Sequence, residues 1–113
     1  MKKAQLITVR QGDVLLRQIA AIPADAKAEA KNDSFGNPRI VLAYGEVTGH
    51  AHAIHDLDSV DVFVAANGSM YLSVKEAVDL QHEEHGTITL PTGNYERVLQ
   101  REYSPEELRN VAD

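Results

Sequence analysis

Apolar and polar residues alternate in short stretches along most of the chain, and residues typical of turns separate these stretches. The alternating or β-branched stretches are residues 6–9, 14–19, 39–44, 60–64, 70–74, 78–82, 87–90 and 95–100. A period of two places one face of a segment in the core, as in an antiparallel strand. Short strands at this spacing predict an all-β fold, a small antiparallel β-barrel or sandwich of the jelly-roll kind.

Two turn signals predict hairpins within this pattern. The tripeptide Gln11-Gly12-Asp13 separates the first two strands, and the dipeptide Asn67-Gly68 separates residues 60–64 from residues 70–74. Asn-Gly is a strong signal for a tight hairpin turn, because both residues tolerate positive φ. We therefore expect one hairpin at the start of the chain and a second in its middle.

Residues 20–38 interrupt the strand pattern and are rich in Ala, Lys, Asp, Pro and Gly. We expect a long exposed loop here, mobile between about residues 24 and 37, because so few apolar residues tie it down. At most, residues 24–31 could form a turn of helix. Loops of this length in a small domain are often functional, so this one could close as a lid.

The end of the chain has the pattern of a helix start. Ser104 suits the N-cap, Pro105 the first helical position and Glu107 the third. This combination predicts one short C-terminal helix, with Leu108 and Val111 on the side that packs on the barrel or on a partner subunit.

Composition narrows the class of protein. The 113 residues suit a single domain, residues 1–113, with one core, and the absence of cysteine excludes disulfides and thiolate zinc sites. A net charge of −6 disfavours binding to long nucleic acid. We find no signal peptide or membrane span in the sequence, so we expect no membrane partner and a soluble, cytoplasmic protein.

The five histidines fall in two clusters that are candidates for chemistry. The first is Gly49-His50-Ala51-His52-Ala53-Ile54-His55, and the second is Gln81-His82-Glu83-Glu84-His85-Gly86. On a strand, His50 and His52 share one face and His55 lies on the other, so we expect His55 to be solvated. By the same parity His82 follows the apolar face, and a bulge at Gly86 would bring in His85.

These clusters predict a divalent metal site, with His50, His52, His82 and His85 as ligands and zinc, manganese, iron or nickel as the ion. Glu83 and Glu84 are the candidate catalytic residues, because a carboxylate can take the proton from metal-bound water. These residues together predict a metal-dependent hydrolase that acts on a small-molecule ligand. We expect the protein to form a homo-oligomer. The H-E-E-H spacing differs from the helical H-E-x-x-H motif of metalloproteases.

Two alternatives use the same residues. Two histidines could act without metal as general acid and base on a phosphodiester of a small nucleotide, with Arg97 or Arg101 holding the anion and Tyr95 nearby. Alternatively, the metal could be structural, in an oligomeric binding module whose loop and terminal helix engage a partner. A closed set of four ligands would favour that module, and an open coordination position would favour catalysis.

His50-x-His52, Asp56 and Pro91-x-Gly93 partly resemble the cupin pattern, with Asp56 in place of the usual glutamate and Glu96 at the place of the last histidine. That resemblance implies a β-barrel with a metal bound by histidines and an acid. Across most of the chain, the segments at residues 46–52, 82–85, 90–95 and 100–103 resemble a group of small uncharacterised proteins of bacteria and their phages. This second resemblance implies a bacterial or phage setting.

Overall fold

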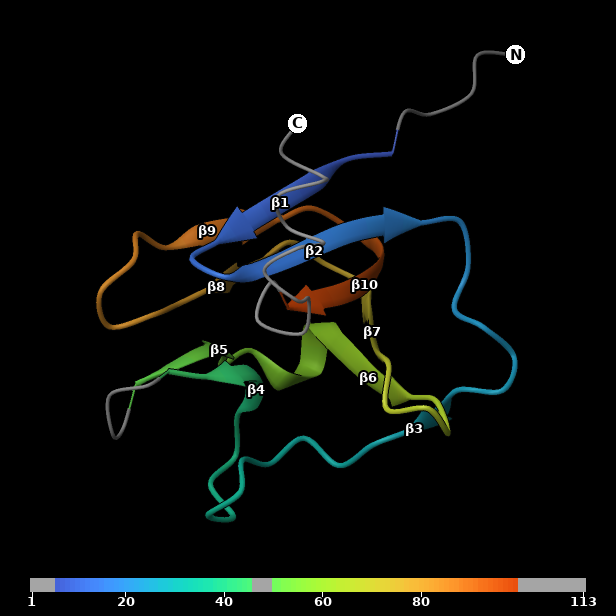
Figure 1. The fold of residues 1–113 in the computed structure, drawn as a ribbon, viewed down its shortest axis with the longest axis horizontal. Helices are drawn as coiled ribbons and strands as arrows, with labels where there is room; N and C mark the ends of the chain where they lie inside the picture. Colours follow the sequence, from blue (N-terminus) through green and yellow to red (C-terminus); the bar gives the residue numbers. More distant parts are fainter. Residues whose placement is uncertain (1–5, 46–49, 100–113) are drawn as a thin grey trace, which may run out of the picture.

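The predicted all-β architecture is confirmed in a computed structural model that describes residues 6–45 and 50–99 (Figure 1). Its elements are the strands β1 (Thr8–Gln11), β2 (Val14–Ile19), β3 (Lys27–Ala28), β4 (Ile40–Tyr44) and β5 (Ala51–Ile54), the 3-10 turn η1 (Leu57–Ser59), and the strands β6 (Val60–Val64), β7 (Met70–Val74), β8 (Val78–Leu80), β9 (Ile88–Leu90) and β10 (Gly93–Leu99). Both predicted hairpins form: β1 pairs with β2 around Gly12, and β6 pairs with β7 around Gly68.

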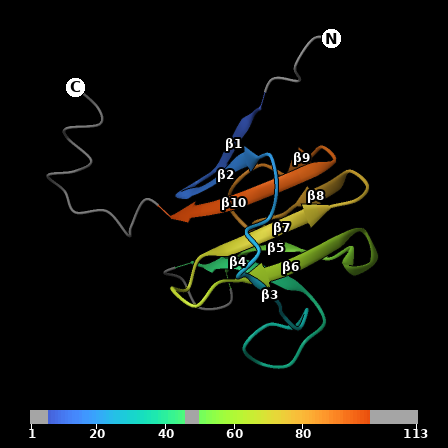
Figure 2. The same ribbon diagram turned by 90° about the vertical axis from the view of Figure 1, so that its right-hand side faces the viewer.

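The strands lie in two layers, and Figure 2 looks onto the six-stranded one, with β1 at the top and β3 at the bottom. One layer is a six-stranded antiparallel sheet in the order β1-β2-β10-β7-β6-β3. The pairs β4-β5 and β8-β9 form the other layer. Two backbone hydrogen bonds between Ala53 and Gln81, each 2.9 Å long, join β5 to the chain that leaves β8.

Of the two expected architectures, the closed barrel does not form: within the described residues every sheet stays open. The six-stranded sheet ends at β1 on one side and at β3 on the other. β3 has only two residues, Lys27 and Ala28, and both are exposed. A short polar edge strand of this kind stops further strand pairing, so the sheets stack as in a sandwich.

A single apolar core fills the space between the layers. The six-stranded sheet contributes Val14, Leu16, Val60, Leu72 and Tyr95, and the other layer contributes Ile40, Leu42, Ile54, Leu80 and Leu90. Each of these side chains is at most 3 % exposed. They belong to the apolar face that the alternation in the sequence predicted to lie in the core. Burying such side chains stabilises the fold by about 1.5–3 kcal/mol each, so the core holds both layers in place.

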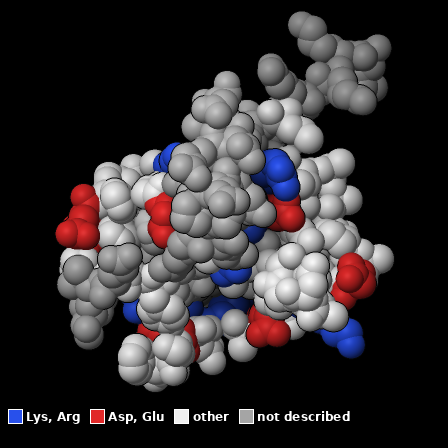
Figure 3. Space-filling view, in the orientation of Figure 1, with Lys and Arg blue, Asp and Glu red and all other residues white. Residues whose placement is uncertain are grey.

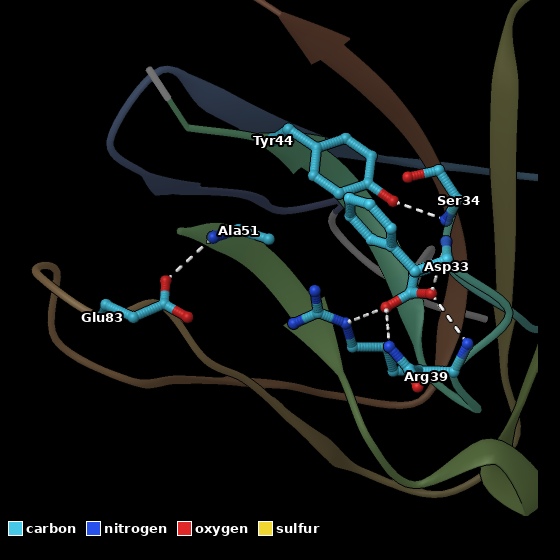
Figure 4. Close-up of polar contacts among 8 residues, drawn as sticks. Asp33, Ser34, Arg39, Tyr44, Ala51 and Glu83 are labelled. Atoms are coloured by element: carbon cyan, nitrogen blue, oxygen red, sulfur yellow. Dashed lines mark hydrogen bonds and ion pairs between the residues drawn. The ribbon is translucent and has the colours of Figure 1, made fainter. Parts of the chain in front are cut away.

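The segment from residue 20 to residue 38 is mostly exposed, as expected, but strand pairing and a buried carboxylate help to tie it down. β3 pairs with β6, where the sequence suggested a turn of helix. Asp33 is buried, and its carboxylate accepts hydrogen bonds from the backbone of Phe35 and Asn37 and from Arg39 Nε (Figure 4). A buried charge needs such partners, which the count of apolar residues could not reveal.

The helix expected from Ser104 lies outside the described residues, as does Arg101. Among the described residues there is no helix long or apolar enough to cross a membrane. On the part of the face drawn in Figure 3 that undescribed residues leave visible, acidic and basic side chains are interspersed.

Candidate functional site

The structure brings four of the five histidines together. The ring centre of His52 lies 4.3 Å from that of His82 and 5.8 Å from that of His85. The His82 and His85 rings are 4.7 Å apart, and His50 joins the group with its ring 5.9 Å from that of His82. The two sequence clusters therefore form one site, which we call the imidazole cluster: His50, His52, His82 and His85.

The two halves of the cluster are held by β5 and by the turn after β8. β5 pairs with β4, and Ala53 of β5 bonds to Gln81 at the start of that turn. His52 is the second residue of β5 and is only 2 % exposed. β8 ends at Leu80, so His82 and His85 lie in the β8–β9 turn and not on a strand as the alternation suggested. Strand parity therefore does not apply to His82 and His85. The turn that carries them connects β8 to β9, which pair in regular register, and both rings lie close to that of His52.

The side chain of Gln11 determines which nitrogen of His52 carries the proton. The Gln11 amide nitrogen donates to the carbonyls of Leu80 and Gly86, at 2.9 and 3.0 Å. Its oxygen must then accept from His52 Nδ1, which lies 2.8 Å away. Nε2 of the neutral His52 ring is left with its lone pair, as in histidine ligands held by an outer hydrogen bond.

Asp13, on the same hairpin turn as Gln11, adds a carboxylate to the cluster. Its Oδ1 lies 3.4 Å from His52 Nε2. Burial lowers the pKa of His52 below 6.5, and the neighbouring His82 lowers it further, while Asp13 acts in the opposite direction. The neutral form of His52, which can bind a metal or accept a proton, is therefore favoured near pH 7.

His82 has the opposite arrangement of protons. Its Nδ1 accepts the backbone N–H of Glu84 at 3.0 Å and that of His85 at 3.3 Å. Since Nδ1 is the acceptor, Nε2 carries the proton in the neutral ring. In this arrangement His82 presents a donor to the cluster, whereas His52 presents a lone pair.

His50 presents an unsatisfied nitrogen. Its Nδ1 is buried and has no hydrogen-bond partner within the described part of the chain, although Glu84 Oε2 is 3.5 Å away. A buried polar atom without a partner costs about 1–3 kcal/mol, so such an atom points to a missing partner or to a function.

Glu83 is placed differently from Glu84, although both were expected to be catalytic. Glu83 Oε1 accepts the backbone N–H of Ala51 at 2.8 Å, which ties the β8–β9 turn to β5 (Figure 4). This hydrogen bond lowers the pKa of Glu83, so its carboxylate is a weak base. Glu84 remains exposed beside His50 and is the better candidate for accepting a proton.

Gly12 lets the first hairpin approach the cluster. Its φ is +59°, and a Cβ atom built on it would lie 2.6 Å from His85 Nε2 and 3.1 Å from His52 Cε1. Any side chain here would displace His85. Together with Gln11 and Asp13, Gly12 makes the β1–β2 turn one wall of the site.

Other candidate residues lie elsewhere. His55 is exposed, as expected. Asp56, the acid of the cupin-like pattern, accepts a hydrogen bond from Ser59 at the start of η1. Arg97, considered as an anion clamp, donates to the Leu42 carbonyl. The hydroxyl of Tyr95, considered as its neighbour, donates to the Pro91 carbonyl from inside the core.

The donor atoms of the cluster do not converge on one point. Among the residues that the structure describes, no three His, Asp or Glu side chains are arranged to hold a metal ion directly. The chemistry of the donor set fits a divalent ion, with a lone pair on His52, an unsatisfied nitrogen on His50 and a carboxylate on Asp13. Binding would need rotation of His82 and His85, which lie on a surface turn.

Sequence reasoning missed Gln11, Gly12 and Asp13, which it treated as a turn alone. They lie about forty and seventy residues from the histidines along the chain, and strand pairing brings them close. The only signal was the glycine between two polar residues. Nothing in the composition linked that turn to the histidines.

Comparison with known proteins identifies a family without an assigned activity. No curated protein and no solved structure matches the chain significantly. Residues 10–100 match the family model described as "Domain of unknown function (DUF8820)", and these residues include the whole imidazole cluster and the β1–β2 turn. The chain therefore belongs to this family of domains of unknown function.

Proposed function

We propose that the imidazole cluster binds one divalent metal ion. The spacing of the rings carries this proposal: His52, His82 and His85 have their ring centres 4.3, 4.7 and 5.8 Å apart. Two imidazoles bound to one tetrahedral zinc, with Zn–N bonds of about 2.1 Å, have their ring centres about 5 Å apart. Small rotations would therefore bring these side chains to coordination distance.

His52 is the fixed ligand, because it is buried and its free Nε2 is set by Gln11. His85 and His82 are the adjustable ligands, and His50 or Asp13 completes the set. His82 binds through Nε2 only if its Nδ1 gives up the backbone N–H groups of Glu84 and His85. Zinc, manganese, iron and nickel all accept such ligands.

A bound ion would supply a Lewis acid and a water whose pKa falls to about 7 at a catalytic zinc. Glu84 is the residue of this chain that would take a proton from that water, because the carboxylate of Glu83 is held by Ala51. With an open coordination position, the site would act as a hydrolase on a small molecule. With four protein ligands it would be structural.

Metal analysis of protein purified without a nickel column tests this proposal. We expect about one divalent ion per chain in the wild type, and none after combined His52→Ala and His82→Ala substitution. His55→Ala is the matched control, since His55 is exposed outside the cluster, and it should keep the ion. A wild-type protein that neither contains nor takes up zinc, manganese, iron or nickel would refute the proposal.

A second candidate function, acid–base catalysis without metal, is favoured by one observation. His52 presents a lone pair at Nε2, while His82 presents its Nε2 proton, and their rings are 4.3 Å apart. Such a complementary pair is what general acid–base cleavage of a phosphodiester needs. Hydrolysis of a phosphodiester by metal-stripped wild type, lost in both His52→Ala and His82→Ala, would support this function over the metal site.

A further inference from the structure

A pocket of about 190 Å³ opens beside β5, next to the imidazole cluster. Ala51 and Ala53 line it with small side chains, and Arg39, His55, Gln81, His82 and Glu83 line it with polar ones. His82 belongs both to this pocket and to the cluster. The pocket is smaller than the sites of about 300–1,000 Å³ that hold drug-sized ligands, so a small ligand suits it.

Arg39 is held rigidly at the pocket. Its Nε donates to the buried Asp33 carboxylate at 2.9 Å, and that carboxylate is itself fixed by the backbone N–H groups of Phe35 and Asn37. In Figure 4 the two terminal nitrogens of Arg39 lie on the side away from Asp33, facing the strand that carries Ala51. Neither has a hydrogen-bond partner within residues 6–45 and 50–99.

The other polar groups of the pocket include more donors. The Gln81 side chain is exposed, and the ring of His82, whose neutral form carries its proton on Nε2, also lines the space. The acid in the wall, Glu83, already accepts a hydrogen bond from Ala51 N. The wall therefore combines a rigidly held guanidinium with one carboxylate whose Oε1 is already hydrogen-bonded.

We propose that this pocket binds a small oxyanion, with the terminal nitrogens of Arg39 as the anchor. A guanidinium edge matches two oxygens of a phosphate, sulfate or carboxylate group, and a pre-oriented Arg loses little side-chain entropy on binding. Gln81 and His82 add donors from the opposite chain segment. The anion would lie beside the imidazole cluster, as the anionic group of a substrate would.

The anchor of this site does not depend on the metal proposal, because Arg39 and Gln81 belong to no candidate metal set; only His82 lines both sites. The test is therefore made on full-length protein treated with EDTA, so that a bound metal cannot bind the anion. The probes are inorganic phosphate, sulfate and acetate, each titrated into isotope-labelled protein while amide and side-chain NMR signals are followed. Comparison of the three probes distinguishes a tetrahedral anion from a carboxylate.

We expect saturable shifts of the Ala51, Ala53, Gln81 and Arg39 signals with at least one probe, with a Kd of about 1 mM or tighter. Arg39→Lys should weaken binding at least tenfold, because the fork is lost while a cation remains beside Asp33. Gln81→Glu should weaken it comparably by adding a negative charge. Gln81 is exposed, so the second variant keeps the test valid if the first one unfolds.

The control is Asn67→Asp, the same amide-to-acid change at the turn between β6 and β7, where the side-chain oxygen can still accept from Ser69 N. It should bind the anion like the wild type. No saturable shift with any probe, or equal affinities in all three variants and the wild type, would overturn the proposal. The metal content of untreated Arg39→Lys protein reports separately on the metal site.

Discussion

Hydrogen-bond partners determine which ring nitrogen carries the proton in the neutral forms of His52 and His82. Gln11 can give only its oxygen to His52, since its nitrogen is used by two carbonyls, so His52 must donate from Nδ1. His82 must accept at Nδ1, because backbone N–H groups point at it. Two neighbouring rings thus have opposite tautomers, which distinguishes their chemical roles.

Gln11→Leu should destabilise the protein and weaken its metal binding. The buried carbonyl of Leu80 loses its donor, which costs about 1–3 kcal/mol. Loss of the outer hydrogen bond to His52 should lower metal affinity about 10–100-fold. Urea unfolding and metal titration measure the two effects. Gln18→Leu is the control for metal affinity, because the hydrogen bonds of Gln18 to Ile7 and Thr92 lie away from the histidines; equal losses of metal affinity in the two variants would contradict the role assigned to Gln11.

Asp33 should make stability fall in acid. Burial alone would raise the pKa of its carboxyl, but hydrogen bonds from Asn37, Arg39 and Phe35 lower it from 3.8 to about 2. The unfolded chain therefore takes up the proton first as the pH falls. The stabilisation is present above about pH 4 and is lost as the pH falls towards 2.

Urea unfolding of wild type and Asp33→Asn between pH 7 and pH 2.5 checks this prediction. The variant should be less stable at pH 7 and should lose less stability on acidification. Asp61 contributes to the acid limb in both proteins, because a hydrogen bond from Lys31 lowers its pKa as well. Parallel acid limbs in the two proteins would show that Asp33 does not titrate as expected.

Among the elements, the β1–β2 turn does more than reverse the chain. Gln11 and Asp13 reach the imidazole cluster from it, and Gly12 keeps the space for His85. The β8–β9 turn supplies the facing histidines, and Glu83 ties that turn to β5. Two hairpin turns and one strand therefore build the site, on a scaffold of regular pairing.

Gly12→Ala and Gly68→Ala should separate backbone strain from steric displacement. Both glycines have positive φ, at +59° and +90°, so alanine costs about 1–2 kcal/mol at either position. Only at Gly12 does the added Cβ meet another group, His85 Nε2. Gly12→Ala should therefore cost more in urea unfolding and should shift the His85 ring signals. Equal costs with an unmoved His85 would contradict the close approach.

For the whole molecule, the site lies where the two layers meet. Gln11 and Asp13 come from the six-stranded sheet, and His52, His82 and His85 come from the other layer. An ion bound between them would stabilise the folded state only, by about 2.7 kcal/mol when free metal is a hundred times the Kd.

Removal of metal with EDTA should therefore lower the melting temperature, and added zinc should restore it. Thermal unfolding followed by circular dichroism measures the change. The protein with both His52→Ala and His82→Ala should show no response to EDTA. A wild-type protein that melts at the same temperature with and without EDTA would indicate that no ion joins the layers.

The sequence by itself determined the class of fold and the identity of the candidate chemistry. Alternation at residues such as Val60, Val62, Val64 and the Asn67-Gly68 turn predicts strands and hairpins, because period two and tight-turn preferences are local properties. The concentration of histidines in two short segments was equally visible. Local patterns of this kind need no knowledge of which strands pair.

Only the tertiary structure decided how these segments combine. The pairing of β3 with β6 decides that the six-stranded sheet stays open. The packing of the β1–β2 turn against the end of β8 decides that Gln11 lies at the imidazole cluster. Parity misplaced His82 because β8 ends two residues earlier. The tautomer of His52 depends on its contact with Gln11, 41 residues away along the chain. The burial of Asp33 and its bond to Arg39 come from a loop that folds around the carboxylate, which a period of two does not encode.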